Sequence, residues 1–162
     1  MLSDELLAIP PLAALHQHLP AAVLEGSLER AEAVLCVNPE QIVEICRALK
    51  SFEPHVRLSA VTCVDWLGRE PRFEVVYQVH FLTGNRRLRL KCRLSSENPE
   101  IDSIVSVWPA ADWYEREVFD LYGVRFRNHP NLCRILMPAD WQGHPLRKDF
   151  PVHGYKYSYR DE

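Results

Sequence analysis

Apolar and polar positions alternate most regularly over residues 86–94 of this chain. Apolar side chains fall on one face of an extended backbone and basic side chains on the other: Leu88, Leu90, Cys92 and Leu94 against Arg87, Arg89, Lys91 and Arg93. This period of two predicts a half-buried antiparallel strand with one solvated face. A tight turn at Thr83-Gly84-Asn85 connects it to a second predicted strand over residues 72–83.

Three other stretches also predict strands. Residues 57–66 alternate between apolar and polar side chains, and residues 33–37 form a short, fully apolar run that is typical of a buried strand. Residues 101–107 are expected to form a further short strand, which Trp108-Pro109 ends. Together with the two strands described above, these stretches are sufficient to form one β-sheet.

Helical signals occur at three places. Asn38 and Pro39 suit the cap and first position of a helix over residues 38–51, whose apolar positions follow helical spacing. Two short helices are expected over residues 3–19, because Pro10-Pro11 interrupts that stretch. A charged helix is expected over residues 110–121, followed by Gly123, which suits the left-handed residue after a helix.

This order of elements predicts an α+β fold, in which helices pack on a mainly antiparallel sheet and an extended C-terminal tail docks on a partner subunit. We expect an α+β domain over residues 1–124, of which residues 1–30 form a helical segment. Residues 125–162 are expected to form the extended partner-docking tail.

Charge and hydropathy exclude two classes of partner. The net charge of −3 argues against a nucleic-acid binder, so the basic row of residues 86–94 is interpreted as a solvated face with acidic neighbours. No apolar run reaches the ~18 residues that a membrane span needs. The acidic N-terminus lacks the features of a signal peptide, so we expect a cytosolic chain, either free or attached to a membrane complex.

The five cysteines are spaced too widely for a familiar motif: Cys36, Cys46, Cys63, Cys92 and Cys133. A zinc site would need closer pairs or histidines at short spacing. We therefore expect reduced, buried thiols, which is the usual state of free cysteine.

The charged helix contains a candidate carboxylate cluster. Glu115, Glu117 and Asp120 could bind a metal ion or perform acid–base chemistry. Dinuclear helical metal sites use Glu-x-x-His, however, and no histidine lies three or four residues from these acids. A structural helix is favoured, with an ion pair between Arg116 and Asp120 one turn apart.

The tail combines prolines with aromatic and basic residues. His129-Pro130, Met137-Pro138 and His144-Pro145 each force an extended or turning backbone. Arginine and tryptophan, which dominate the binding energy of many interfaces, lie between these turns, so an interface is expected. His129 and His144 have no obvious third metal ligand and are interpreted as structural.

Signatures of independent catalysis are missing from the sequence. It contains neither Gly-x-Ser-x-Gly nor a glycine-rich phosphate loop, and its six glycines are scattered. The residues alone indicate an α+β scaffold with a docking tail.

The C-terminal third also resembles a known family, the 30 kDa subunit of respiratory complex I. That family comprises the C subunit of bacterial NADH-quinone oxidoreductase and the J subunit of the related cyanobacterial and chloroplast dehydrogenase. The resemblance covers these motifs: Glu115-Arg116-Glu117, Asp120-Leu121-Tyr122-Gly123, His129, Arg134-Ile135-Leu136-Met137-Pro138, Asp140-Trp141 and the run from Gly143 to Phe150. Cys133 stands where the family pattern leads us to expect a basic residue or proline.

The resemblance implies residues for the family motif and subunit interface: Glu115, Arg116, Glu117, Asp120, Tyr122, His129, Arg134, Trp141, His144, Arg147, Lys148 and Asp149. It implies no catalytic, cofactor-binding or metal-binding residue in this chain. FMN, the iron–sulfur clusters, NADH and quinone would all bind to other subunits, which agrees with the lack of closely spaced cysteines.

The implied function is that of an accessory scaffold in the peripheral arm of a proton-pumping NADH-quinone oxidoreductase. Its partners would be the 49 kDa-like quinone-site subunit and neighbouring iron–sulfur subunits. It would lie on the cytoplasmic face of the bacterial inner membrane, attached only through the complex. Two alternatives stay open: the equivalent subunit of a membrane-bound hydrogenase or formate hydrogenlyase, and an independent enzyme using the carboxylates of residues 115–120 with His129.

Overall fold

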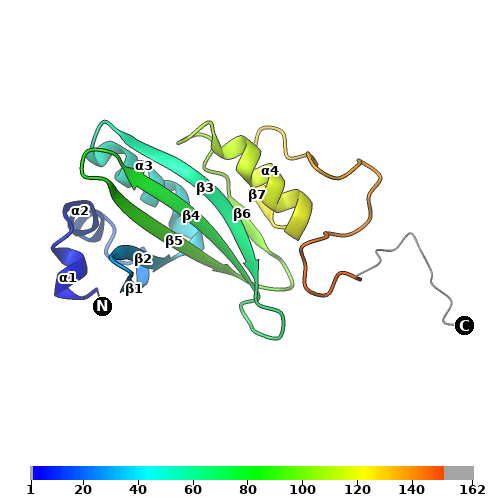
Figure 1. Ribbon diagram of the computed structural model, residues 1–162, viewed down its shortest axis with the longest axis horizontal. Coiled ribbons are helices and arrows are strands. Elements are labelled where there is room, and N and C mark those ends of the chain that lie inside the picture. Colours follow the sequence, from blue (N-terminus) through cyan, green and yellow to red (C-terminus); the bar gives the residue numbers. More distant parts are fainter. Residues whose placement is uncertain (1, 152–162) are drawn as a thin grey trace, which may run out of the picture.

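The computed structural model describes residues 2–151 and contains a five-stranded mixed sheet with helices packed against it (Figure 1). The strand order is β1-β2-β5-β4-β3, and only the β2–β5 pair is parallel. The strands span β1 Val23–Glu29, β2 Glu32–Val37, β3 Val56–Asp65, β4 Phe73–Phe81 and β5 Arg86–Leu94. A second, parallel pair joins β6 (Glu100–Asp102) to β7 (Arg125–Arg127). The predicted α+β class with a mainly antiparallel sheet is confirmed.

The helices divide between two regions of the molecule. At the N-terminal end lie α1 (Asp4–Leu7) and α2 (Pro10–His18). The short turn η1 (Pro39–Gln41) leads into α3 (Ile42–Phe52), and α4 (Ala111–Tyr122) lies beside β3 (Figure 1).

The core lies between the sheet and these helices. Apolar positions of α3, chiefly Ile45, Cys46 and Leu49, are fully buried against the inward side chains of the sheet. The largest of those inward side chains are Phe73 and Tyr77 of β4. Burying such side chains supplies most of the favourable free energy of folding.

The outer face of β5 has the acidic neighbours that its basic row predicted. Arg93 lies 3.1 Å from Glu25, and Arg87 lies 3.4 Å from Glu32. Arg89 and Lys91 also contact glutamates of β1, β2 and β4. The interpretation of a solvated, charge-paired face is confirmed.

The prediction of a helical segment over residues 1–30 is wrong for its last part. Strand β1 occupies Val23–Glu29 and forms a hairpin with β2 through Arg30 and Ala31, whose φ angles are +54° and +65°. Two successive positive φ angles match the turn that suits a twisted hairpin. Most of β1 is exposed at the sheet edge, so it lacks the apolar alternation by which a strand is predicted.

The globular part also extends beyond residue 124. Strand β7 lies within the predicted tail, yet it pairs with β6 through residues 125–127. A boundary at residue 124 would separate the two strands of this small sheet. Residues 128–151, called the C-terminal segment from here on, contain no further helix or strand. The predicted tail beyond residue 151 lies outside the described residues.

Four of the five cysteines are buried as expected, and none of the five forms a disulfide. Cys133 is the exception, because it is exposed in the C-terminal segment. Between residues 2 and 151, no helix has both the length and the apolar character to cross a membrane.

Candidate functional site

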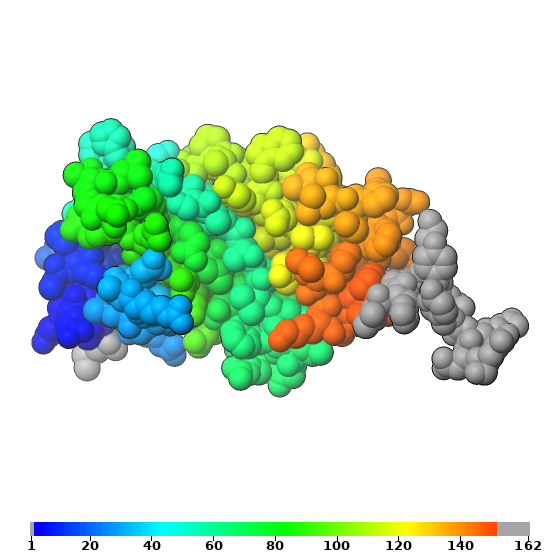
Figure 2. Space-filling view, in the orientation of Figure 1, coloured from blue at the N-terminus to red at the C-terminus, as the bar shows by residue number. Residues whose placement is uncertain are grey.

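Helix α4 and the C-terminal segment together form the region that the motif residues build. In Figure 2 the segment, in orange, lies against α4, in yellow, and reaches the loop that precedes β4. Val118 and Ala111 of α4 are buried in the core, as are two carboxylates, Glu115 and Asp120. These two acids fix different parts of the chain.

Asp120 binds the start of the C-terminal segment through both of its carboxylate oxygens. Its Oδ2 accepts the backbone N–H groups of Ile135, Leu136 and Met137 at 3.0, 2.8 and 2.9 Å. Its Oδ1 accepts Nη1 of Arg134 at 2.7 Å. Successive N–H groups pointing at one oxygen form a concave anion site made of backbone.

This environment keeps Asp120 ionised. Burial alone would raise its pKa, but the three N–H groups and the Arg134 guanidinium outweigh burial and lower the pKa below its usual value. Arg134 is itself fixed, because it also donates to the carbonyls of Asp120 and Gly143. The Asp120 site therefore consists of a fully hydrogen-bonded carboxylate and a bent backbone around it.

The end of α4 is held by a second set of contacts. His144 Nδ1 lies 2.9 Å from the carbonyl oxygen of Asp120, and its ring packs edge-on against Phe119. Arg147 donates from Nε to the carbonyl of Tyr122 and lies over the Phe73 ring at 5.0 Å. These bonds satisfy carbonyls that a helix end leaves without partners.

Gly123 makes that arrangement possible. It has a φ angle of +75°, which favours glycine. A Cβ at this position would also lie 2.5 Å from Nη2 of Arg147 and from Nε2 of His144. Both the backbone conformation and the positions of His144 and Arg147 thus favour glycine.

A second buried carboxylate, Asp65 at the end of β3, anchors the far end of the segment. Asp65 forms a two-pronged ion pair with Arg72, at 2.8 and 2.7 Å, and accepts the backbone N–H of Lys148 at 2.8 Å. Arg72 also pairs with Asp149 at 2.8 Å. The hydrogen bonds from Arg72 hold the pKa values of Asp65 and Asp149 below their usual range.

Glu115 lies in a different environment, with no exposed surface. It accepts the Ser103 hydroxyl at 2.6 Å and the backbone N–H of Ile104 at 2.8 Å. Burial is the dominant effect and raises its pKa to about 7, although both hydrogen bonds oppose the shift.

His129 lies beside Glu115 and is buried. Its Nε2 is 3.9 Å from Glu115, and 3.3 and 3.2 Å from the carbonyl and Oδ1 of Asp112. The backbone N–H of Asn131 donates to Nδ1 at 3.0 Å, so the ring proton of the neutral form lies on Nε2. His129 thus joins the C-terminal segment to the start of α4.

The expected ion pair between Arg116 and Asp120 does not form, because Asp120 points into the segment and Arg134 occupies it. Arg116 instead donates to the carbonyl oxygen of Cys133 at 3.2 Å and approaches its sulfur at 3.1 Å. It also lies over the ring of Trp113. Glu117 is exposed on the helix surface.

The remaining motif residues are partly buried or exposed. Tyr122 and Trp141 are half-buried, and the Trp141 indole N–H has no hydrogen-bond partner within residues 2–151. Lys148 places its ammonium 6.0 Å from the Trp66 ring centre.

The structure therefore groups the predicted residues into two anchors. One brings together Asp120, Arg134 and His144. The other brings Lys148 to Asp65 and Asp149 to Arg72. Sequence reasoning missed Asp65 and Arg72, which lie 83 and 77 residues from their partners in the segment. Their only local signal is an acid at a strand end and an arginine just before the next strand.

The three candidate acids Glu115, Glu117 and Asp120 do not form a joint chemical site. Glu115 and Asp120 are directed into separate hydrogen-bond networks, and Glu117 faces solvent. Across residues 2–151, no three His, Cys, Asp or Glu side chains converge as metal ligands would. The buried carboxylates mainly fix backbone.

Several large apolar side chains are exposed on α4, on the C-terminal segment and on the loop before β4. Trp113, Leu136 and Leu146 expose 62%, 55% and 50% of their surface, and Trp66 and Leu67 of the neighbouring loop expose 37% and 48%. Aromatic and aliphatic side chains displayed on fixed backbone are characteristic of protein interfaces. A protein-binding surface is the arrangement best supported by this geometry.

Comparison with known proteins gives a consistent result. Residues 35–156 match the family model described as "Respiratory-chain NADH dehydrogenase, 30 Kd subunit". The chain is 48% identical over 141 residues to the C subunit of the NADH-quinone oxidoreductase of Geobacter metallireducens, covering 86% of this chain and 87% of that protein. It is 46% identical over 144 residues to the corresponding subunit of Roseiflexus castenholzii, covering 87% and 82%.

Two solved structures share the fold. A trypsin-resistant fragment of Nqo5 is superimposed with a TM-score of 0.61 and 25% identity, covering 67% of this chain and 89% of the fragment. A chain of an archaeal membrane-bound sulfane sulfur reductase gives a TM-score of 0.74 at 24% identity, covering 87% and 84%. The second likeness concerns the fold alone.

Proposed function

The chain belongs to the 30 kDa subunit family of respiratory-chain NADH dehydrogenase (complex I), and from this we propose that it is a cofactor-free structural subunit of the enzyme's peripheral arm. In this role it supports the 49 kDa-like subunit that forms the quinone site. Electrons pass from NADH to quinone through FMN and iron–sulfur clusters on other subunits.

One observation supports this role most strongly. The Asp120 carboxylate and the Asp65 carboxylate fix the two ends of residues 134–148 to the domain. Between and beside these anchors, Leu136 and Leu146 remain exposed. A surface that is already ordered loses little conformational entropy on binding, which favours a stable subunit contact.

The motif residues and the contact residues consequently differ in role. Arg134, His144 and Arg147 direct their side chains to the chain's own α4, so they shape the segment. Trp113, Leu136 and Leu146, together with Trp66, provide the apolar surface for the partner. The proposed partners are the 49 kDa-like subunit and adjacent iron–sulfur subunits.

The proposed location is the cytoplasmic face of the bacterial inner membrane, with attachment only through the complex. The relatives named above are subunits of NADH-quinone oxidoreductase, which supports this complex over a related hydrogenase or formate hydrogenlyase. The proton-pumping activity belongs to the whole assembly.

Affinity purification tests this proposal. A tagged chain, expressed in its own bacterium and extracted in mild detergent, should co-purify with a 49 kDa-like subunit and with NADH-quinone reductase activity. Isolated chain should contain less than about 0.1 equivalent of iron, zinc or flavin. Recovery as a lone monomer would overturn the partner assignment, and a stoichiometric cofactor on the isolated chain would overturn the structural role.

A further inference from the structure

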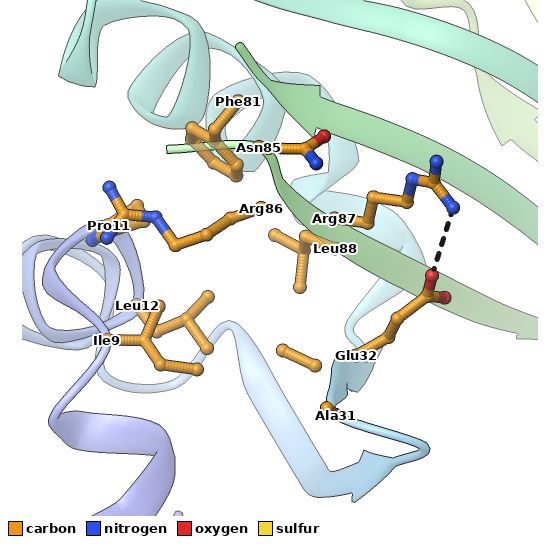
Figure 3. A pocket seen from close by; sticks show the side chains of 11 residues that line it. Ile9, Pro11, Leu12, Ala31, Glu32, Phe81, Asn85, Arg86, Arg87 and Leu88 are labelled. Carbon is orange, nitrogen blue, oxygen red and sulfur yellow. Dashed lines mark hydrogen bonds and ion pairs between the residues drawn. The ribbon is translucent and has the colours of Figure 1, made fainter. Parts of the chain in front are cut away.

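A cavity of about 360 Å³ lies among the α1–α2 junction, the β1–β2 turn and the start of β5 (Figure 3). Figure 1 shows these elements at the end of the molecule opposite the C-terminal segment. One wall comes from Ile9, Pro11 and Leu12 at the junction of α1 and α2. The β1–β2 turn at Ala31 and the start of β5 form the other walls. Its volume is within the ~300–1,000 Å³ that is typical of small-molecule sites.

Most of the lining is apolar. Seven of the eleven lining residues are Ile, Leu, Pro, Phe or Ala. Leu12, Phe81 and Leu88 are almost completely buried and form the floor, so the inner wall of the cavity is the hydrophobic core itself. An apolar group entering this space would leave water for a fixed hydrocarbon surface.

One cation in the lining has no counter-charge. The Arg86 side chain forms neither an ion pair nor a hydrogen bond with another residue in the range 2–151, and its Nε is buried without a partner. Its guanidinium lies against the β4–β5 turn, where a Cβ on Gly84 would be only 3.1 Å from it. Figure 3 shows this side chain extending across the cavity toward Pro11.

The neighbouring arginine is different. Arg87 points away from the cavity centre toward Glu32, at 3.4 Å, as the dashed line in Figure 3 indicates. Its charge is therefore compensated within the chain. The net electrostatic character of the cavity is that of the single Arg86 guanidinium above an apolar floor.

We propose that this cavity binds a small amphiphilic monocarboxylate, with its hydrocarbon group on Leu12 and Leu88 and its carboxylate on Arg86. A guanidinium matches a carboxylate with two parallel hydrogen bonds, which the two terminal nitrogens of Arg86 can donate. One uncompensated cation suits one negative charge better than the double charge of a phosphate monoester. This site is separate from the partner surface around α4.

The test uses the full chain with methyl-labelled isoleucine and leucine, titrated with sodium octanoate and monitored by NMR. Octan-1-ol, which has the same hydrocarbon length but no charge, serves as the matched ligand. Saturable shifts at Ile9, Leu12 and Leu88 with one-to-one stoichiometry are expected for octanoate. Octan-1-ol should bind at least about tenfold more weakly, because it cannot form the charge-assisted pair.

Two variants make the result specific. Arg86→Gln should weaken octanoate binding at least about tenfold. Arg57→Gln removes the same charge from an exposed position of β3 outside the cavity lining and should change binding less than about twofold. Melting temperatures and methyl spectra of both variants verify folding. The proposal is overturned by absent or unsaturable binding, by equal effects of the two substitutions, or by equal affinity for octanoate and octan-1-ol.

Discussion

Asp120 and Arg134 form an ion pair of 2.7 Å between a fully buried carboxylate and a largely buried guanidinium. The same carboxylate accepts three successive backbone N–H groups just beyond Arg134. One side chain of α4 therefore fixes both the side chain and the backbone of the C-terminal segment.

Asp120→Asn should destabilise the isolated chain by about 3 kcal/mol, because Arg134 would lose its buried counter-charge. The amides of residues 135–137 should exchange with solvent far faster than in the unmodified protein. Urea unfolding and hydrogen exchange measure the two effects. Glu117→Asn, on the exposed face of α4, is the control and should change the unfolding free energy by less than about 0.5 kcal/mol. Equal effects of the two substitutions would contradict the role given to Asp120.

Glu115 should make stability depend on pH between about 5 and 7.5. Its folded pKa of about 7 lies above the unfolded value of about 4.3, so the folded state binds more protons in this range. The stabilisation is complete below the unfolded pKa and is lost as pH rises through about 7. The loss is on the order of 3 kcal/mol.

Comparison with Glu115→Gln isolates this contribution. His144 acts in the opposite sense, because burial lowers its pKa, but its effect is the same in both proteins. Asp65, Asp120 and Asp149 have lowered pKa values and lose their contribution only at more acidic pH. The unfolding free energy of Glu115→Gln minus that of the unmodified chain should increase from pH 5 to 7.5. A constant difference would show that Glu115 does not titrate in this window.

Gly123→Ala should be more harmful than Gly68→Ala. Both glycines have positive φ angles, +75° and +88°, so each alanine incurs backbone strain of about 1–2 kcal/mol. Only at Gly123 would the new Cβ also meet His144 and Arg147, whereas nothing lies within 4 Å of it at Gly68. Thermal unfolding of the two variants measures the difference, and equal losses would mean that the segment moves away freely.

Arg147→Ala should lower the stability of the isolated chain by about 1–3 kcal/mol, since it removes a donor to the Tyr122 carbonyl and packing on Phe73. Lys148→Ala is the neighbouring control, because its side chain is exposed and alanine retains the backbone N–H that donates to Asp65. Its unfolding free energy should stay within about 0.5 kcal/mol. An unchanged melting temperature for Arg147→Ala would indicate that this residue acts only toward a partner.

The elements that could be predicted from the sequence were those with regularly spaced apolar residues or a recognisable end signal. The alternation of apolar and basic side chains over residues 86–94 predicted strand β5. Gly123 predicted the end of α4, because glycine readily adopts the left-handed conformation that follows a helix. Strand β1 could not be predicted in this way, because an edge strand exposed on both faces needs no apolar alternation.

The anchors were predictable only in part. Resemblance to the family singled out Asp120 and Arg134, but local spacing suggested Arg116 as the partner of Asp120. The pairing of Asp65 with Lys148 joins residues 83 positions apart, and no local pattern specifies such a contact. Long-range hydrogen bonds of this kind depend on the assembled sheet.

The central claim is that the C-terminal segment contacts the partner subunit. Measuring subunit association of the variants Leu136→Asp and Leu146→Asp tests this claim most directly. Both side chains are exposed and apolar on the C-terminal segment, and Leu82→Asp alters a comparably exposed leucine, at 46%, after β4. We expect the first two variants to reduce co-purification of the 49 kDa-like subunit at least about tenfold, because a charge would be buried at the contact. Their melting temperatures should change little, because both side chains are exposed in the isolated chain. Leu82→Asp should assemble normally. Normal assembly of both segment variants would contradict the proposed partner surface.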